Sequence, residues 1–372
     1  MNIYSDIKTE NIIKEMYSKE LMLKNPLQVI TLSDATILPS KDRLGGVVDK
    51  EGHFVWESAY RYGDTNLWGG SYEVVTEDIE YIPEKVIFIG QMQTHWGNFL
   101  YDCMARIWYV LQEKESYRIV YCGMQSEEGM LSDSSKKYHE FLQLLDIKLD
   151  RLSDIRKATK FETVIIPQLM VFPGTFYTKE FINVFDVAIK NANKQMTGML
   201  YYDKIYFTRR QMLACKELGE KEIEKIFEAN GFQVIAPESL SLSEQIYYVN
   251  HCKVFGSIEG TASHNIIFAN EAVEHIILRK QDYINTRQII FNKARKVIPR
   301  YIDIFYEPFT NYPISHDTGP FWIGVTVFMR QWMRQQGLSC SPKRQFINMM
   351  VNLRNGMIYI LKCLYYKYWL KY

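Results

Sequence analysis

Two stretches of alternating strand and helix patterns constrain the fold of this 372-residue chain more than any other feature. From Pro83 to Pro167, short apolar runs that are typical of buried strands alternate with helix patterns. After a polar break at 191–198 the alternation restarts and continues to Leu278. Alternation of this kind predicts βαβ units, and therefore parallel sheets with helices on their faces. We expect two Rossmann-like domains facing one cleft, with ligands at the carboxyl ends of the strands.

The predicted elements can be placed by residue number. The first stretch predicts strands at 86–90, 118–122 and 163–167, and helices at 95–111 and 137–145. The second predicts strands at 204–208, 232–236, 253–256 and 274–278, and helices at 220–229, 243–250 and 262–269. Residues 1–80 are interpreted as a β-rich extension, with a hairpin whose arms at 44–48 and 53–56 flank Asp49-Lys50-Glu51-Gly52.

Composition excludes several classes of protein. Hydrophobic residues at 47% and charged residues at 23% indicate a folded chain rather than a disordered one. Aromatic residues at 14% suit carbohydrate faces, but they suit any core as well. Six scattered cysteines without a C-x-x-C pair favour a reducing compartment over a disulfide framework or a zinc site. We see neither a secretory signal nor an apolar run of about 18 residues, so we expect a cytoplasmic location.

The charge is distributed unevenly. The whole chain carries +1, yet no acidic residue follows Asp317 and the last 55 residues carry +8, so the rest carries −7. Basic residues from Arg330 to Lys371 alternate there with Phe, Met, Leu, Tyr and Trp. This pattern predicts a segment at the surface of an anionic membrane. The alternative is a helix that closes back on the first domain, and nucleic acid is not expected because the rest of the chain is acidic.

The turn at 256–265 is the most informative short segment. It contains Glu259 and Gly260 after a predicted strand, and a helix is predicted from Ala262. The free N–H groups and the dipole at the start of such a helix form a site for phosphate. Thr261 can cap the helix, and Glu259 can accept hydrogen bonds from ribose or sugar hydroxyls. The alternative is an ordinary strand–turn–helix joint, since glycine patterns alone are weak signals.

Two arginines, Arg209 and Arg210, follow the predicted strand at 204–208. Guanidinium groups at that edge can clamp a diphosphate bidentately and stabilise it as a leaving group. The alternative is a solvated pair of surface cations.

The helix predicted from His95 carries a polar stripe. At about 100° per residue, His95, Asn98, Asp102 and Arg106 share one face, while Trp96 lies on the apolar side. The helix begins near the carboxyl edge of the sheet, so we expect His95 and Asn98 to face a cleft. A histidine or carboxylate there can deprotonate a hydroxyl group. Asp102 would orient His95 or pair with Arg106, and the alternative is a solvated or capping histidine.

Taken in order, these segments resemble glycosyltransferase family 61 in its bacterial polysaccharide-biosynthesis branch, which makes capsules and exopolysaccharides. The resemblance runs through Tyr206–Arg210, Glu222, Gly231–Val234, Pro237–Ile246 and Gly256–Asn265. The helix at 95–102 is similar to the family's weaker N-terminal signature. Residues 1–80 and the tail after about residue 305 lie outside the resemblance. Eukaryotic members usually carry His-Gly-Ala where this chain has Glu259-Gly260-Thr261, which bears on the sugar accepted.

The resemblance implies a GT-B fold, an inverting reaction, a nucleotide-sugar donor, with a UDP-sugar expected, and no metal or other cofactor. The domains would be a β-rich extension at 1–80, an acceptor-side domain at 81–197, a donor domain at 198–305 and a closing helix with basic tail at 306–372. Arg209 is the implied diphosphate contact, and Glu238 and Gln245 belong to the nucleotide-side pocket. The other donor-side positions implied are Thr208, Arg210, Gly256, Ser257, Gly260, Thr261, Ala262, Ser263, His264 and Asn265.

An inverting transfer needs a base on the acceptor side and charge stabilisation on the leaving diphosphate. His95 is the first candidate for the base, followed by Asp102 or Glu259, with Asn98 and Trp96 on the acceptor side. The acceptor is expected to be a glycan or a lipid-linked saccharide at the inner face of a membrane. The alternatives are a transferase that uses another diphosphate-containing donor, and a non-catalytic protein that binds sugars or nucleotides.

Overall fold

A computed structural model describes residues 1–62, 66–93, 95–123, 136–211, 216–307 and 319–369. The chain forms two compact units: unit 1 contains residues 1–20 and 196–372, and unit 2 contains residues 21–195. Each unit is built around a six-stranded sheet that contains parallel strands. The predicted α/β class with parallel sheets is therefore confirmed. Cys215, Leu370 and Lys371, and the side chains of Lys367 and Trp369, lie outside the described part of the chain.

The sheet of unit 1 is parallel throughout. Its strands, in spatial order, are β14 (Gln233–Ile235), β12 (Lys204–Phe207), β15 (Val254–Ile258), β16 (Glu274–Arg279), β17 (Arg300–Asp303) and β1 (Asn2–Tyr4). Counted along the chain from β12, the first five follow the order 2-1-3-4-5 of doubly wound folds. All strands predicted after residue 200 are present, with shifts of one or two residues at their ends.

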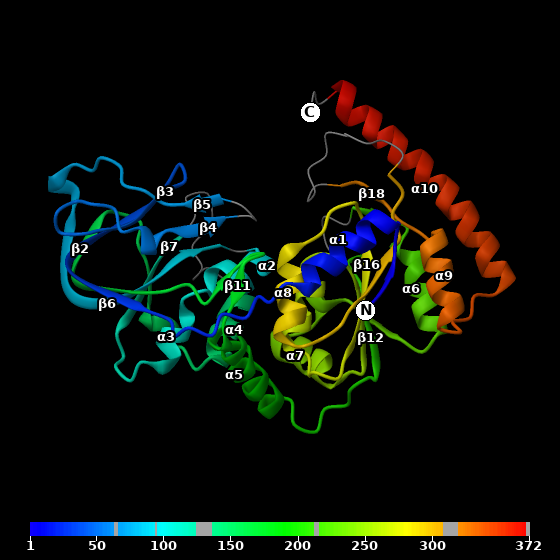
Figure 1. The fold of residues 1–372 in the computed structure, drawn as a ribbon, viewed down its shortest axis with the longest axis horizontal. Coiled ribbons are helices and arrows are strands. Elements are labelled where there is room, and N and C mark those ends of the chain that lie inside the picture. Colours follow the sequence, from blue (N-terminus) through cyan, green and yellow to red (C-terminus); the bar gives the residue numbers. More distant parts are fainter. Residues whose placement is uncertain (63–65, 94, 124–135, 212–215, 308–318, 370–372) are drawn as a thin grey trace. The chain divides into compact units, whose positions relative to one another are not determined.

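Helices cover both faces of this sheet. Figure 1 shows α1 (Ile7–Ser18), α7 (Leu242–His251) and α8 (Thr286–Ala294) on one face, and α6 (Glu220–Ala229) and α9 (Val327–Gln335) on the other. Helix α7 begins with a capping box formed by Ser241 and Glu244. The long α10 (Pro342–Trp369) lies outside α9 (Figure 1). Short elements complete the unit, namely β13 (Glu217–Leu218) paired with β18 (Phe321–Trp322), and the 3₁₀ helices η6 (Pro237–Ser239) and η7 (Ser263–Phe268).

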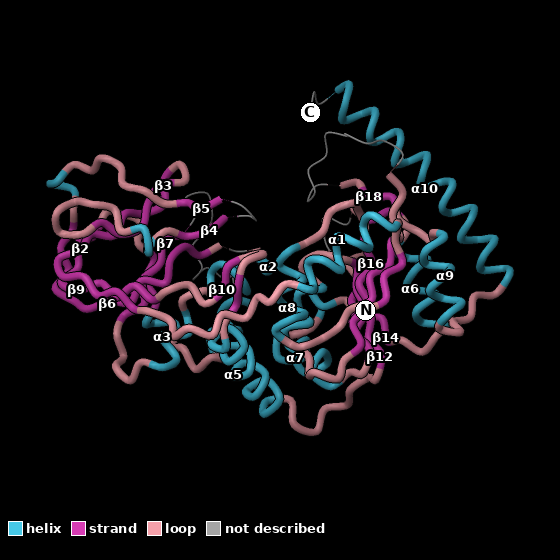
Figure 2. The backbone as a smooth tube through the Cα atoms, in the orientation of Figure 1, coloured by secondary structure: helices cyan, strands magenta, loops and turns pink. Residues whose placement is uncertain are grey.

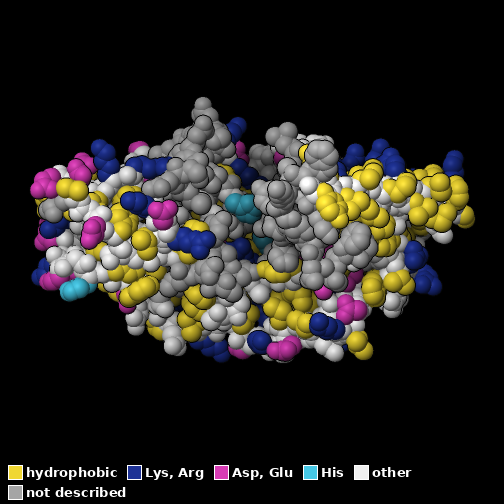
Figure 3. Space-filling view, turned by 90° about the horizontal axis from the view of Figure 1, so that it is seen from above, with side chains coloured by type: hydrophobic (Ala, Val, Ile, Leu, Met, Phe, Trp, Pro, Cys, Tyr) yellow, Lys and Arg dark blue, Asp and Glu magenta, His cyan; other side chains and the backbone are white. Residues whose placement is uncertain are grey.

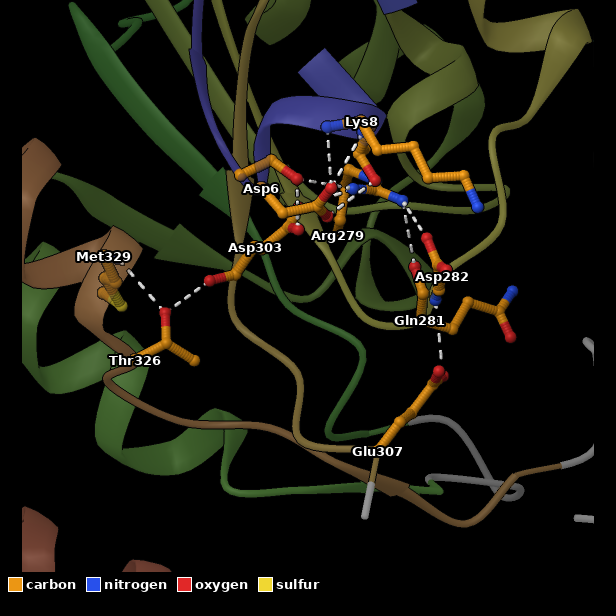
Figure 4. A network of polar contacts seen from close by, with 11 residues as sticks. Asp6, Lys8, Arg279, Gln281, Asp282, Asp303, Glu307, Thr326 and Met329 are labelled. Atoms are coloured by element: carbon orange, nitrogen blue, oxygen red, sulfur yellow. Dashed lines mark hydrogen bonds and ion pairs between the residues drawn. The ribbon is translucent and has the colours of Figure 1, made fainter. Parts of the chain in front are cut away.

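Residues 1–20 join unit 1 through buried polar contacts (Figure 4). Arg279 at the end of β16 is fully buried and pairs with Asp303 at the end of β17, with 2.7 Å between Nη1 and Oδ1. Ser5, which follows β1, donates to the other oxygen of Asp303 at 2.5 Å. Asp6 then caps α1 by accepting from the N–H groups of Lys8 and Thr9. Beside them the side chain of Ile13 packs against Ile277 and Tyr301 of the sheet.

Unit 2 contains a mixed sheet (Figure 2). Its strands, in spatial order, are β3 (Leu44–Val48), β2 (Val29–Lys41), β9 (Thr159–Pro167), β6 (Glu80–Met92), β7 (Arg118–Gly123) and β8 (Leu152–Asp154). The last four are parallel, whereas β2 and β3 pair antiparallel at one edge. Helices α2 (Trp96–Asn98), α3 (Ile107–Gln112), α4 (Lys136–Leu144) and α5 (Lys179–Gln195), a π-helix at Phe99–Cys103 and 3₁₀ helices at Trp56–Ser58, Thr76–Asp78 and Leu149–Arg151 accompany it. Two small pairs, β4 (Tyr60–Tyr62) with β5 (Asn66–Trp68) and β10 (Val171–Phe172) with β11 (Phe176–Tyr177), complete the unit.

The structure divides the chain differently from the predicted boundaries at 80, 197 and 305. Residues 1–20 belong to unit 1, and β2 and β3 share a sheet with β6 and β9, so residues 1–80 do not form one extension. The boundary near 197 agrees with the end of unit 2 at Gln195. The segment after 305 belongs to unit 1. The predicted hairpin turn is present, since the Asp49 N–H donates to the carbonyl of His53 at 2.9 Å.

Candidate functional site

The candidate site of unit 1 lies where the strand order reverses, at the carboxyl ends of the neighbouring strands β12 and β15. Doubly wound sheets bind their ligands at such a point. Arg209 follows β12, and Glu259 and Gly260 follow β15. Gly260 has a φ of +135°, and a Cβ placed on it would lie 3.4 Å from Nη1 of Arg209. The structure therefore brings the predicted arginine and the predicted glycine turn together.

Arg209 belongs to a group of two cations around one carboxylate. Its Nε and the Nζ of Lys280 each lie 2.9 Å from Oε1 of Glu217, whose side chain is 1% exposed. Burial alone would raise the pKa of Glu217, but the charges of Lys280 and Arg209 outweigh it and lower the pKa. Lys280 also lies 4.0 Å above the ring of Phe321. Two positive charges share one negative charge, so this group keeps a net positive charge that suits an anion.

The turn that carries Arg209 is held by two glutamates of α6. Oε1 of Glu220 accepts the N–H of Arg209 at 3.0 Å and the hydroxyl of Tyr206 at 3.1 Å. Burial raises the pKa of Glu220 to about 7. Glu224 pairs with Arg210 and accepts the hydroxyl of the buried Thr208. Thr208 therefore stabilises the turn, and Arg210 is anchored to α6 beside Arg209.

Glu259 is buried beside this group. The residue is 4% exposed, and neither carboxylate oxygen accepts a hydrogen bond of normal geometry from a residue that the structure describes, although the backbone N–H of Asn285 is close enough to lower the pKa of Glu259 slightly. Burial raises the pKa of Glu259 to about 7, although the charge of Arg279 partly opposes the increase. A buried polar group without a partner is costly, so a ligand hydroxyl at this position would be stabilised.

The helix predicted at 262–269 is wrong in type, because η7 is a 3₁₀ helix of six residues. Its i→i+3 hydrogen bonds take the N–H groups of Ser263 and His264, which donate to the carbonyls of Gly260 and Thr261 at 3.0 and 3.3 Å. The N–H of Asn265 donates to Ala262 in the same way at 3.2 Å. These three amides are thus satisfied within the turn. Fewer free N–H groups therefore remain for an anion than the predicted helix N-terminus would offer. The positive charge at this edge comes mainly from side chains.

Other predicted donor-side residues support the turns from behind. Gly256 lies in β15, where a Cβ would meet the rings of Phe227 and Tyr206 at 3.2 and 3.3 Å. The buried hydroxyls of Ser257 and Ser263 lie 2.7 Å apart. His264 and Asn265 are buried as well. Nδ1 of His264 lies 3.0 Å from Oε1 of Gln288. These residues shape the turn, since their side chains are packed inside unit 1.

The two predicted residues near the end of β14 differ in exposure. Glu238 is exposed on η6. Gln245 on α7 is 2% exposed and donates to the carbonyls of Pro237 and Leu240 at 2.7 and 3.3 Å. Gln245 therefore holds the loop that presents Glu238.

The helix predicted at 95–111 is broken in unit 2. A π-turn at 99–103, in which the N–H of Met104 donates to the carbonyl of Phe99 at 3.2 Å, separates α2 from α3. His95 is exposed directly before α2, and Asp102 is half-buried in the π-turn. The expected stripe is wrong for Arg106, which is 1% exposed and donates to the carbonyls of Pro167, Glu57 and Ala59.

The two predicted acceptor-side residues are tied into unit 2. Trp96 is buried in an aromatic cluster, stacked on Phe99 at 5.8 Å, with Lys137 4.1 Å above its ring. Asn98 is half-buried and donates to Gln93 at 2.9 Å. Sequence reasoning missed Lys280, although its place directly after the buried strand at 274–278 was an available signal.

A family model matches part of the chain. The family model described as Glycosyltransferase 61 matches residues 96–276, which include the ends of β12 and β15 and the helix after His95. No curated protein matches the chain. In the described residues, no three His, Cys, Asp or Glu side chains are grouped as metal ligands, and metal independence stays a prediction. Residues 96–276 are thus a glycosyltransferase family 61 domain, and the chain that carries it is a glycosyltransferase.

Proposed function

We propose that this enzyme transfers a sugar, with inversion, from a nucleotide-sugar donor, expected to be a UDP-sugar, to a hydroxyl of a glycan or lipid-linked saccharide. We place the two sheets in the two halves of a GT-B fold and assign donor binding to unit 1. The doubly wound strand order of unit 1, with cations at its switch point, supports this assignment. We further propose that the reaction needs no metal.

The contact that carries the proposal is the group of Arg209, Lys280 and Glu217 beside Gly260. The acceptor oxygen forms a bond to the anomeric carbon while the bond from that carbon to the diphosphate breaks. The electron pair of the broken bond leaves on the diphosphate oxygen, and a guanidinium and an ammonium group can stabilise this charge. Glu217 holds both cations in place before the donor arrives, so the site is preorganised.

The acceptor proton passes to a base. His95 remains the first candidate because it is exposed at the start of α2, in the unit assigned to the acceptor. Asp102 and Glu259 are the alternatives. A pKa of about 7 would let Glu259 accept or donate a hydrogen bond to a donor hydroxyl near neutral pH. We therefore assign Glu259 first to recognition of the ribose or sugar.

We also propose that the enzyme acts at the cytoplasmic face of a membrane in polysaccharide assembly. The basic, aromatic segment after Asp317 supports this location.

A thermal-shift panel with UDP, GDP and CMP tests the donor class. We expect one of them to raise the melting temperature, because a ligand that binds only the folded state stabilises it. Turnover of the matching radiolabelled nucleotide sugar then tests catalysis. No shift with any nucleotide, together with no hydrolysis or transfer of labelled donor, would contradict the proposal.

A further inference from the structure

Helix α10 buries Asn348, Asn355 and Gly356 together with Tyr359 and Cys363, and it leaves many of its large apolar side chains exposed. Among these, Met357 and Leu361 are 61% and 66% exposed. Figure 3 shows hydrophobic side chains gathered along this helix at the right of the view, with Lys and Arg at their border. The other exposed apolar residues of α10 are Phe346, Met349, Met350, Leu353, Ile360, Leu364, Tyr365 and Tyr368.

Specific contacts fix α10 in this orientation. The indole N–H of Trp322 on β18 donates to Oδ1 of Asn352 at 2.8 Å. A Cβ on Gly356 would lie 2.6 Å from the Trp322 ring, so the helix packs closely against β18 at this glycine. Arg344 lies 3.7 Å from Glu222 of α6. These contacts, together with the packing of the buried Tyr359 against Trp322, fix the inward side of α10, so the exposed apolar side chains are directed outward.

A cavity of about 840 Å³ lies between α9 and α10. Its lining is mainly apolar and includes Met333, Leu338, Phe346 and Met349. Arg330 and Arg334, one helical turn apart on α9, also line it and are exposed. Arg330 donates to the carbonyl of Val325 at 2.8 Å, but a guanidinium has five N–H donors and can contact a further acceptor.

We propose that α10 and the Arg330–Arg334 turn of α9 form one docking surface for an anionic phospholipid bilayer. The exposed side chains of α10 enter the boundary between headgroups and acyl chains, the two arginines bind headgroup phosphates, and the cavity receives an acyl chain. The chain carries no Asp or Glu after residue 317, so nothing in this segment opposes an anionic surface. The inference rests on the proposed function, because it specifies how the enzyme reaches the membrane.

The helix lies on the membrane rather than across it in this proposal. In the described part of the chain, no helix is long and apolar enough to cross a membrane. At 28 residues, α10 extends roughly 40 Å along its axis, long enough to place many side chains in one interface.

Co-sedimentation with lipid vesicles tests the surface. The wild-type chain should bind phosphatidylglycerol vesicles, bind phosphatidylcholine vesicles much more weakly, and lose binding as salt increases. Arg330→Gln with Arg334→Gln should lower the partition coefficient roughly 30-fold, at about fivefold for each charge near an anionic surface. Met357→Ser with Leu361→Ser should also lower it, since both side chains lose apolar insertion. The control is Lys190→Gln with Lys194→Gln, a matched pair on α5, which should leave binding unchanged.

Circular dichroism of each variant verifies folding, and UDP titration without vesicles tests donor binding separately. Equal partition of wild type and the arginine variant on phosphatidylglycerol would overturn the proposal. Absence of vesicle binding by the wild type would also overturn it. A wild-type dimer that dissociates in the Met357→Ser, Leu361→Ser variant would overturn it as well, because a second copy of the chain would then cover the apolar side. Loss of UDP binding with vesicle binding retained would instead contradict the proposed function.

Discussion

Replacing Glu259 by Gln should remove a specific pH dependence from the stability of the protein. Glu259 is 4% exposed, and its carboxylate oxygens accept no hydrogen bond of normal geometry within the described residues. Burial moves its pKa from 4.5 to about 7. Between these values the folded protein holds a proton that the unfolded chain has released. The free energy of unfolding must therefore fall as the pH rises through this interval.

The magnitude follows from the same shift. A pKa that moves from 4.5 to about 7 corresponds to about 3 kcal/mol. At pH 5 both Gln and the protonated Glu are neutral, so the variant and the wild type should be about equally stable. At pH 8 the wild type carries a buried carboxylate, and Glu259→Gln should be more stable by up to about 3 kcal/mol.

Urea unfolding at both pH values measures this difference. Comparing the variant with the wild type at the same pH cancels the contribution of all other titrating groups. Glu228→Gln is the matched control, because Glu228 is exposed on α6 and its replacement should change stability little at either pH. An equal difference between variant and wild type at pH 5 and pH 8 would refute the reasoning, as would a variant that is less stable at pH 8.

Three further predictions concern the turns and the site. Gly219→Ala should lower the free energy of unfolding, measured by urea titration, by about 2 kcal/mol or more. Gly219 has a φ of +126°, and an added Cβ would lie 2.1 Å from the carbonyl oxygen of Ile323. An unchanged unfolding midpoint would contradict this prediction. Lys280→Gln should weaken calorimetric UDP binding by roughly 10- to 150-fold, since a hydrogen bond to a charged group contributes about 1.5–3 kcal/mol, and unchanged affinity would remove Lys280 from the site. His95→Ala should abolish transfer while calorimetric donor binding stays intact, and retained transfer would exclude His95 as the base.

Local patterns in the sequence predicted the carboxyl ends of the strands closely, but they missed the starts of β6 and β9, which begin at Glu80 and Thr159 instead of 86 and 163. The alternation placed Arg209 and Glu259 at the carboxyl edge of a parallel sheet, but their meeting at the switch point depends on β12 and β15 being neighbours, which the alternation does not determine. The capping box at Ser241 is a local pattern, because cap and N3 residue are three positions apart.

The remaining features depend on contacts between distant residues. Glu217 binds Lys280 only because β13 approaches the end of β16, and no local pattern encodes that approach. The pairing of β1 with β17 joins residues 2–4 to residues 300–302, which are far apart in the sequence. The break at 99–103 accompanies the burial of Arg106 against three distant carbonyl groups, whereas helix periodicity alone places that guanidinium on a polar stripe.

Turnover of Arg209→Ala, compared with Arg300→Ala, tests most directly whether the β12 edge binds the diphosphate. Arg300 is the matched control, because it lies at the amino end of β17, away from the carboxyl edge of the sheet. There it pairs with Glu274, at the amino end of β16, at 2.8 Å. We predict that Arg209→Ala lowers kcat by about 10²–10³ while Arg300→Ala stays near wild type. Near-normal kcat in Arg209→Ala, with the KM for the donor also unchanged, would contradict the assignment.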